Sequence, residues 1–322
     1  MICRTLAEVP ASFGPAAVTI GNFDGVHAGH RHIMRRTVEI AREHGWRSAV
    51  LTFDPHPMRL LAPERAPRLL TTLEQRCAWI ASQGIERVLI LPFTREISQL
   101  TPEEFVRLIL VDRLHARAVL VGENFRFGNR AAGNTGTLRE LGARHGFQTE
   151  VVGAIRRRNR VVSSSEVRRL IESGNVALAC RLLERPFALE GAVVPGQGIG
   201  SRQTVPTLNL ETGSEVLPAV GVYITRTFDS GGGRVWESIT NVGRRPTFGG
   251  EKLTIETFLL SAFDGEAPAA IRVEFLRRVR EERKFESPEA LKAQIFKDVG
   301  RARTYFRRVR RAGRFLLAPS LD

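Results

Sequence analysis

Several features that would point to other classes of protein are scarce in this chain. No apolar run approaches the roughly 18–20 residues that a membrane-spanning helix needs. The first residues soon reach Glu8 and Pro10 and lack the apolar stretch of a signal peptide. Three cysteines, Cys3, Cys77 and Cys180, are too few and too far apart to predict a disulfide framework or a zinc knuckle. We therefore expect a soluble, cytoplasmic protein without a membrane partner.

Lysine and histidine are each missing from one part of the chain. No lysine precedes Lys252, which excludes a P-loop lysine or a Schiff-base lysine from everything before it. All seven histidines lie in the first 145 residues. Any chemistry of the C-terminal half must therefore proceed without an imidazole.

What the chain does have is arginine and an otherwise ordinary globular composition. The 48 basic residues outnumber the 34 acidic ones, which gives a net charge of +14. Arginine binds phosphate with a planar fork of donors, so the surplus suits nucleic acid or phosphorylated small molecules. With 43% hydrophobic residues, 25% charged residues and a length of 322, we expect about two ordered domains.

The first half alternates between two patterns. Short β-rich apolar runs occur at 17–20, 48–53, 88–91, 119–121 and 151–152. Amphipathic, helical patterns lie between them, near 31–44, 72–83, 102–114 and 137–145. This alternation predicts an α/β domain with a Rossmann-like parallel sheet covered by helices, whose ligands bind at the carboxyl ends of the strands.

The second half has a different texture. Two short helices are expected near 164–173 and 176–184, before Arg185-Pro186. Five β-like runs follow among glycine- and proline-rich turns, at 189–194, 221–227, 235–241, 253–260 and 271–276. They predict an antiparallel barrel or sandwich, followed by a helix from about 287 to 311. We place the domain boundary near 185, giving domains 1–184 and 185–322.

The stretch from Gly21 to His30 is the most informative. A buried strand ends there in a glycine-rich loop, and His27 and His30 flank Gly29 where the first helix begins. A helix N-terminus favours negative charge, and two imidazoles can hydrogen-bond phosphate oxygens as charge develops. Gly29 would let a nucleotide approach the backbone. The pattern predicts attack on a nucleotide α-phosphate; a zinc pair or a plain turn are the alternatives.

Three later segments carry side chains suited to a nucleotide or a flat ring. Phe53, Pro55 and Pro57 form a stiff apolar loop on which a ring could stack, or an ordinary proline-rich loop. Asn124 and Arg126 follow a strand and offer an amide and a guanidinium fork to a ribose or phosphate.

Ser163 and Glu166 have the spacing of a capping box, with Arg168 one turn into the helix. The free amides of that helix could hold the ATP phosphates, although the box by itself could be only a cap.

In the C-terminal half, Gly196, Gly198 and Gly200 form a glycine-rich run that could cradle phosphates or simply turn the chain. Thr207 and Asn209 alternate on an expected strand, so their oxygens should face one side. A hydroxyl and an amide carbonyl suit Mg²⁺, which shares its coordination shell with substrate phosphates.

These motifs together resemble one family. The phrase from Gly21 to His30, Gly-Asn-Phe-Asp-Gly-Val-His-x-Gly-His, resembles the nucleotidylyltransferase superfamily and, within it, the bacterial bifunctional riboflavin kinase/FMN adenylyltransferases (FAD synthetases). Later segments match that family's motifs in order, at 52–57, 121–128, 163–168, 206–209, 241–248, 254–258 and 280–285.

The resemblance implies an N-terminal nucleotidylyltransferase domain and a C-terminal riboflavin kinase barrel with a terminal helix. The catalytic residues it implies are His27, His30 and Glu256. The residues implied to bind ATP for adenylylation are Gly21, Asn22, Phe23, Gly29, Asn124, Ser163, Ser164 and Arg168. Those implied to bind the flavin there are Phe53, Asp54, Pro55, His56, Pro57 and Arg126. Those implied to bind ATP for the kinase are Gly196, Gly198, Gly200, Thr207, Asn209 and Asn241, with Mg²⁺ on Thr207 and Asn209.

Glu256 also follows from chemistry. Phosphorylation of a hydroxyl needs a base for its proton, and without a histidine after position 145 that base must be a carboxylate. Glu256 lies in an expected strand among apolar and β-branched neighbours, where the family has its catalytic glutamate. It could instead be an exposed residue of an alternating strand; Glu251 and Asp264 are the next acids to consider.

The implied activity has two steps. ATP phosphorylates riboflavin to FMN with release of ADP, and a second ATP transfers AMP to FMN, giving FAD and pyrophosphate. We expect no nucleic-acid or membrane partner, and a monomer or weak homo-oligomer. An RNA-binding or tRNA-modifying protein on a similar fold is the alternative; it would explain the charge, but the chain lacks the aromatic-rich basic strand of an RNA-recognition motif.

Overall fold

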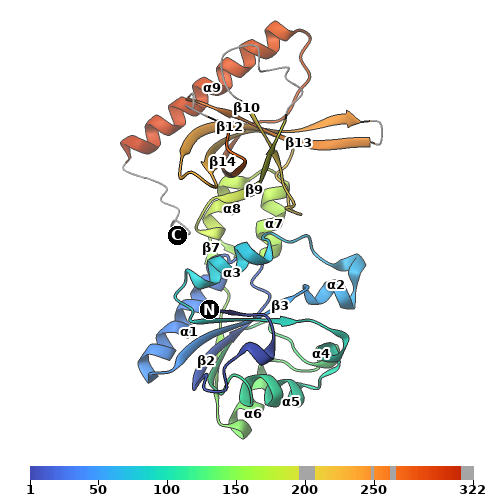
Figure 1. Ribbon diagram of the computed structural model, residues 1–322, viewed down its shortest axis with the longest axis vertical. Coiled ribbons are helices and arrows are strands. Elements are labelled where there is room, and N and C mark those ends of the chain that lie inside the picture. Colours follow the sequence, from blue (N-terminus) through green and yellow to red (C-terminus); the bar gives the residue numbers. More distant parts are fainter. Residues whose placement is uncertain (196–206, 248–249, 262–265, 313–322) are drawn as a thin grey trace. The chain divides into compact units, whose positions relative to one another are not determined.

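The computed structural model describes residues 1–195, 207–247, 250–261 and 266–312, and many of its secondary-structure elements are labelled in Figure 1. By packing, the chain forms two compact units, residues 1–164 and 165–320. The second unit includes α7 (Ser164–Glu172), from Ser165 onward, and α8 (Val176–Leu183), the two helices expected before residue 185. The predicted division of the chemistry near 185 stays a prediction.

A six-stranded parallel sheet forms the centre of the first unit. Its strands, in spatial order, are β1 (Ile2–Cys3), β4 (Arg87–Pro92), β3 (Arg47–Asp54), β2 (Ala16–Ile20), β5 (Ala116–Gly122) and β6 (Gln148–Val152). From β2 the chain steps through β3 to β4, and then returns to the other side of β2 for β5 and β6. This reversal creates a switch point beside the carboxyl end of β2, where ligands of open parallel sheets bind. The predicted parallel sheet is confirmed.

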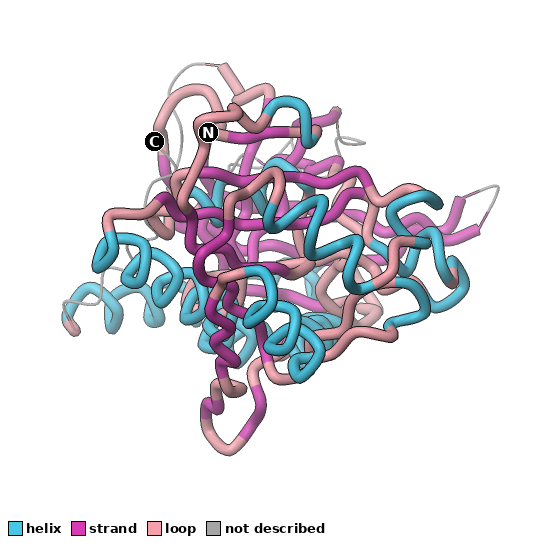
Figure 2. Tube along the Cα trace, turned by 90° about the horizontal axis from the view of Figure 1, so that it is seen from below, coloured by secondary structure: helices cyan, strands magenta, loops and turns pink. Residues whose placement is uncertain are grey.

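The helices of this unit lie between its strands along the chain; Figure 2 draws helices in cyan and strands in magenta. The helices are α1 (Ala28–His44), α2 (Pro57–Leu61), α3 (Leu73–Ala81), α4 (Arg95–Gln99), α5 (Pro102–Phe105) and α6 (Thr135–His145), with 3₁₀ turns at Leu6–Glu8, Pro63–Arg65 and Asn129–Ala131. The helix expected over 102–114 is divided, because a π-helical segment, η3 (Val106–Val111), follows α5. A short hairpin, β7 (Arg156–Arg157) and β8 (Arg160–Val161), precedes α7.

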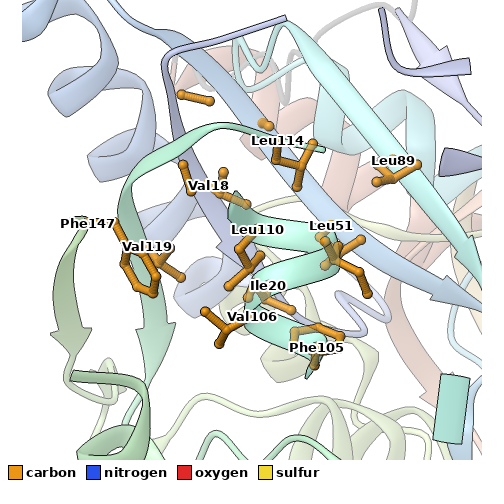
Figure 3. Close-up of a cluster of buried hydrophobic side chains, with 14 of the residues drawn as sticks. Val18, Ile20, Leu51, Leu89, Phe105, Val106, Leu110, Leu114, Val119 and Phe147 are labelled. Carbon is orange, nitrogen blue, oxygen red and sulfur yellow. The ribbon is translucent and has the colours of Figure 1, made fainter. Parts of the chain in front are cut away.

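Both faces of the sheet are covered. Val18, Ile20 and Leu51 point to one face and pack against η3 and the residues around it, including Leu110 and Leu114 (Figure 3). The alternate strand residues point to the other face and pack against α1 and α3. Because both faces are buried, the central strand β2 is apolar except for Thr19, with every residue buried.

The core of the second unit is a closed antiparallel barrel. Of the two architectures predicted from the sequence, the structure therefore has the barrel and not the sandwich. Its strands, around the barrel, are β10 (Thr207–Glu211), β13 (Gly250–Leu259), β12 (Val235–Thr247), β11 (Gly221–Asp229), β14 (Ala270–Arg280) and β9 (Phe187–Val194). The predicted C-terminal helix is present as α9 (Pro288–Arg311), which begins at the capping residue Ser287. Ala302 and Phe306 of α9 pack on Val222 and Ile239 outside the barrel.

The barrel interior contains a chain of hydroxyl groups. Thr225, on β11, lies 2.8 Å from both Ser238 and Thr240 of β12, oxygen to oxygen. Thr227 lies 2.8 Å from Ser238, and Thr240 lies 3.0 Å from Thr257 of β13. All five side chains are buried, and their mutual hydrogen bonds offset the cost of burying them. Residues next to them in sequence therefore point outward.

Among the described residues, no helix combines the length and the apolar character needed to cross a membrane.

Candidate active sites

The loop after β2, residues 21–27, which we call the β2 loop, presents the two predicted histidines at the start of α1. His27 is the capping residue of α1, and its Nδ1 accepts a hydrogen bond of 3.3 Å from the backbone N–H of His30. A neutral ring whose Nδ1 accepts carries its proton on Nε2, so Nε2 is a donor. The two rings are stacked, with centroids 3.6 Å apart and planes inclined by 18°. The pair thus forms one block of imidazole at a helix N-terminus.

Glycine and phenylalanine shape the surroundings of the histidines. The buried ring of Phe23 meets His30 edge to face, with centroids 5.1 Å apart. A Cβ on Gly29 would lie 3.3 Å from the ring of His27, and a Cβ on Gly21 would lie 3.1 Å from the ring of Phe23. Gly29 therefore makes room for the catalytic candidate itself; its predicted role in the approach of a nucleotide stays a prediction.

Asp24, which sequence reasoning did not single out, tethers the β2 loop. Its buried carboxylate accepts hydrogen bonds from the backbone N–H of Leu70 at 2.9 Å and of Thr71 at 3.3 Å. The backbone carbonyl of Asp24 accepts a bond of 2.9 Å from the hydroxyl of Ser164. The structure thus brings Ser164, and with it the partly buried Ser163, to the loop that holds the histidines. Arg168 lies further along α7, in the second unit.

The loop after β3, residues 53–57, which we call the β3 loop, joins the β2 loop through side chains. His56 is buried; its Nδ1 accepts from the N–H of Met58, and its Nε2 lies 3.0 Å from the side-chain amide of Asn22. With Nδ1 accepting, the neutral ring donates through Nε2, so we assign the amide oxygen of Asn22 to that contact. Phe53 is half-buried, and its ring lies edge to face with that of Phe93.

The remaining predicted residues of this site also lie at the carboxyl edge of the sheet. Asp54 ends β3, Pro55 is exposed, and Pro57 is the first residue of α2. Asn124 and Arg126 are exposed in the loop after β5, where the Arg126 guanidinium donates to the carbonyl of Phe125. The three strands β3, β2 and β5 are neighbours, so the three loops that follow them share one edge of the sheet.

The candidate kinase residues lie on three adjacent strands of the barrel. Glu256 of β13 is directly opposite Asn209 of β10 on one side and Asn241 of β12 on the other. Residues that oppose each other across antiparallel strands share a face, with Cβ atoms about 4.5–5.5 Å apart. Thr207, opposite Phe258, lies two residues along the same face. The register therefore places Asn209, Glu256 and Asn241 in one row, which we call the Asn-Glu-Asn row.

This row faces the outside of the barrel. Asn241 and Glu256 are each next to an inward-pointing threonine, and Ile239, two residues before Asn241, packs beneath α9. The side chain of Glu256 is partly buried. Gly196, Gly198 and Gly200, the predicted phosphate cradle, lie outside the described residues.

A second carboxylate, missed by the sequence reasoning, lies near the row. Gly243 is two residues after Asn241, and a Cβ there would be 2.7 Å from Oε1 of Glu282 and 3.0 Å from the amide nitrogen of Asn241. Glu282 follows β14 and is distant in sequence, so only its place in the 280–285 motif could have signalled it. Of the acids named earlier as alternatives, Glu251 pairs with Pro246 and Asp264 lies outside the described residues.

The fold and the two sites define a class: a parallel-sheet domain with stacked histidines at its switch point, followed in the chain by an antiparallel barrel with its own polar site. The family model of FAD synthetase matches residues 10–166, and that of riboflavin kinase matches residues 183–306. A bifunctional riboflavin kinase/FMN adenylyltransferase of Pseudomonas fluorescens is 37% identical over 94% of this chain and 96% of its own length. The protein of that name from Escherichia coli K12 is 35% identical over 90% and 92%.

The chain therefore belongs to the bifunctional riboflavin kinase/FMN adenylyltransferase family. A crystal structure described as a macrolide-efflux protein from Streptococcus pneumoniae superposes with a TM-score of 0.84, at 24% identity, over 94% of this chain and 98% of that one. At that identity the likeness concerns the fold alone. Both family models name flavin enzymes, which disfavours the RNA-binding or tRNA-modifying alternative.

Proposed function

We propose that this protein makes FAD from riboflavin in two ATP-dependent steps, each at one of the two candidate sites. The barrel phosphorylates riboflavin to FMN, and the parallel-sheet unit transfers AMP from a second ATP to FMN. The observation that carries the proposal is that the two family models divide between the two sites: one covers the stacked histidines and the other covers the Asn-Glu-Asn row.

In the adenylylation step, an oxygen of the FMN phosphate attacks the α-phosphorus of ATP. A new phosphorus–oxygen bond forms, and the bond to the leaving pyrophosphate breaks. Negative charge accumulates on the α-phosphate in the transition state, and donors already aimed at it lower the barrier. His27 Nε2–H, the ring of His30 and the N-terminus of α1 supply this field. The β3 loop, with Phe53 and His56, holds the flavin.

In the kinase step, Glu256 accepts the proton of the riboflavin 5′-hydroxyl while the oxygen attacks the γ-phosphorus, and ADP leaves. Its carboxylate has an amide on each side, Asn209 and Asn241, which can orient the base or bind the nucleotide.

Magnesium belongs to the proposal for the barrel. Thr207 and Asn209 offer two hard oxygen donors on the face that carries Glu256, a set that fits Mg²⁺ shared with substrate phosphates. The ion, when bound, neutralises phosphate charge. The described residues contain no group of three or more His, Cys, Asp or Glu side chains suited to a metal, so most of its ligands would come from ATP and water.

The test is to incubate the pure protein with riboflavin, ATP and Mg²⁺ and to separate FMN and FAD by chromatography. We expect FMN first and FAD after it, with both lost when EDTA removes the metal and restored by excess Mg²⁺. A protein that makes neither flavin product would refute the proposal. Light scattering on the same sample tests whether the protein is a monomer or weak homo-oligomer. A salt-dependent gel shift with RNA would instead favour the alternative, an RNA-binding or tRNA-modifying protein.

A further inference from the structure

Arg76 occupies a position in the core where an arginine is unexpected. It lies on α3, on the side that faces the sheet together with the buried residues Cys77 and Ile80, and only 3% of it is exposed. Charged side chains are almost never buried to this extent unless their charge is satisfied. The partners of the guanidinium therefore indicate why the residue is there.

Those partners belong to the two loops of the adenylylation site. Nη1 donates to the backbone carbonyl of Asn22, in the β2 loop, at 2.9 Å. Nη2 donates to the carbonyl of Phe53, in the β3 loop, at 3.2 Å, and lies 3.8 Å from the carboxylate of Asp54. The Asn22 carbonyl also accepts from the hydroxyl of Thr52 at 3.2 Å. One rigid, planar group thus sets the spacing between the two loops.

The charge of Arg76 makes this connection strong. Burial lowers the pKa of Arg76, and the nearby charge of Asp54 acts in the opposite direction. An arginine side chain is not deprotonated in proteins, so the guanidinium keeps its charge at neutral pH. Hydrogen bonds from a charged donor are stronger than neutral ones, and more so where water is excluded.

We propose that Arg76 is a positioning residue for adenylyl transfer: it holds the β2 loop, which leads to the histidines, in register with the β3 loop, which holds the flavin. The inference rests on the proposed function. Under that function, transfer requires the phosphate of FMN in line with the α-phosphate of ATP, and the β2 loop bounds the ATP site whereas the β3 loop bounds the flavin site. The same two loops are joined a second time by the contact between Asn22 and His56, so backbone and side chains are both fixed.

The geometry requires the planar guanidinium with its two donors, and not only a positive charge. A lysine at position 76 would keep a buried cation on α3, but its single ammonium group cannot reproduce the planar pair of bonds to both carbonyls. A methionine would fill similar space and leave both carbonyls without this donor. Comparison of the two substitutions therefore separates positioning from simple filling of the core.

The experiment measures kcat and KM for FMN and for ATP in the full-length parent, Arg76→Lys and Arg76→Met. Phosphorylation of riboflavin by the same samples is the internal control, and thermal unfolding reports the folded fraction. Arg36→Met is the matched variant: Arg36 also bridges elements of this unit, from α1 to Glu150 at 3.1 Å, but it contacts neither loop. Since a displacement of about 1 Å can cost about 10²-fold in rate, we expect Arg76→Lys to lower the kcat of FAD formation by about that factor.

We expect smaller changes in KM, an unchanged kinase rate, a loss in Arg76→Met at least as large as in Arg76→Lys, and parental rates in Arg36→Met. Arg76→Lys acting at the parental kcat would overturn the inference. A loss of FAD formation no larger than the loss of folded protein would also overturn it. If Arg76→Met does not fold, Arg76→Lys decides alone. A parent that makes no FAD would instead reject the proposed function, whatever the variants do.

Discussion

At the scale of single residues, the two candidate histidines differ in what else they do. Both rings stack on each other, but the side chain of His27 also caps α1, whereas the ring of His30 meets Phe23. Catalytic and structural contributions can therefore be separated between two neighbouring side chains of the same type. Glu256 and Glu282 are likewise two side chains of one type near one face of the barrel, so substitution of each can separate their contributions.

We expect His27→Ala and His30→Ala each to lower the turnover of FAD formation by 10²–10³-fold, about 3–4 kcal/mol, because each removes a donor from the developing charge. His27→Ala should also lose about 0.5–2 kcal/mol of stability, since it removes the cap of α1. Steady-state kinetics and thermal unfolding measure the two effects, with riboflavin phosphorylation as the unchanged control. Full-rate FAD formation by His30→Ala would refute the assignment.

In the barrel, we expect Glu256→Gln to bind ATP and riboflavin but to phosphorylate riboflavin about 10²–10⁴-fold more slowly, because glutamine cannot take the hydroxyl proton. Added FMN should still be adenylylated. Glu282→Gln is the matched variant and should lose far less. A Glu256→Gln protein as fast as the parent, with a slow Glu282→Gln, would assign the base to Glu282.

Thr207→Ala should affect nucleotide binding instead. It should mainly raise the KM for Mg²⁺–ATP, because it removes one of the two proposed oxygen ligands of the metal.

Cys180 provides a test of burial in the second unit. Burial, assisted by the nearby charge of Glu274, raises the pKa of its thiol to about 11. Only the thiolate reacts with iodoacetamide, so in a Cys3→Ser/Cys77→Ser protein the labelling rate should rise about tenfold per pH unit from pH 8 to near 11. In the urea-unfolded protein, the labelling rate should level off above about pH 8.5, the usual thiol pKa. A plateau near pH 8.5 in the folded protein would contradict this environment.

At the scale of elements, η3 shows how tertiary packing modifies a local preference. The capping box at Thr101 and Glu104 starts a helix as the sequence predicts. Beyond α5, backbone bonds then run from Asp112 to Arg107 and from Leu114 to Ile109, which is the wider π spacing. This turn presents a broad apolar surface to the sheet, whereas Leu108 faces solvent.

Leu110→Ala should therefore lower the free energy of unfolding of the first unit by about 2–5 kcal/mol, because it leaves a cavity in the core. Leu108→Ala, from the same segment but 40% exposed, should change it by no more than about 0.5 kcal/mol. Urea unfolding measured by tryptophan fluorescence in a Trp236→Phe background reports on this unit, since Trp46 and Trp79 both lie in it. Equal effects of the two substitutions would contradict the packing of η3.

At the scale of the whole molecule, residues 167–182 lie between the two family models, and packing assigns them to the second unit. The family models meet between 166 and 183, and the packing units meet after Ser164. Residues 165–184 contribute α8, which packs on β14 and β9, and seven buried apolar side chains: Val167, Leu170, Ile171, Val176, Ala179, Leu182 and Leu183. α8 therefore supports the barrel.

A fragment of residues 1–184 should convert FMN to FAD and leave riboflavin untouched. A fragment of residues 165–322 should phosphorylate riboflavin, and its thermal transition should lie above that of residues 185–322, because the shorter fragment exposes the barrel surface that α8 covers. Chromatography of the products and calorimetry make the comparison. Phosphorylation of riboflavin by residues 1–184, or equal stability of the two barrel fragments, would show that this division is wrong.

The sequence alone determined the features that local pattern carries. Strand–helix alternation predicts the parallel sheet, glycine next to His27 and His30 marks the first turn, and the change of texture after 185 predicts an antiparallel β domain. These features depend on neighbours within a few positions, where periodicity and capping preferences act. Residue chemistry indicated some candidate site residues, such as His27, His30 and Glu256, and the family resemblance added others, such as Asn22 and Asn241. The roles of all of them remain predictions.

Only the tertiary structure decided the relations between distant positions. Strand register placed Asn209 and Asn241 on either side of Glu256. Pairing of the first strand, β9, with both β10 and β14 closed the sheet into a barrel. The partners of Arg76 and the approach of Glu282 to Gly243 come from separate elements. The physical reason is the same in each case: long-range pairing is selected by the packing and register of the whole unit, and a single sequence does not display those contacts.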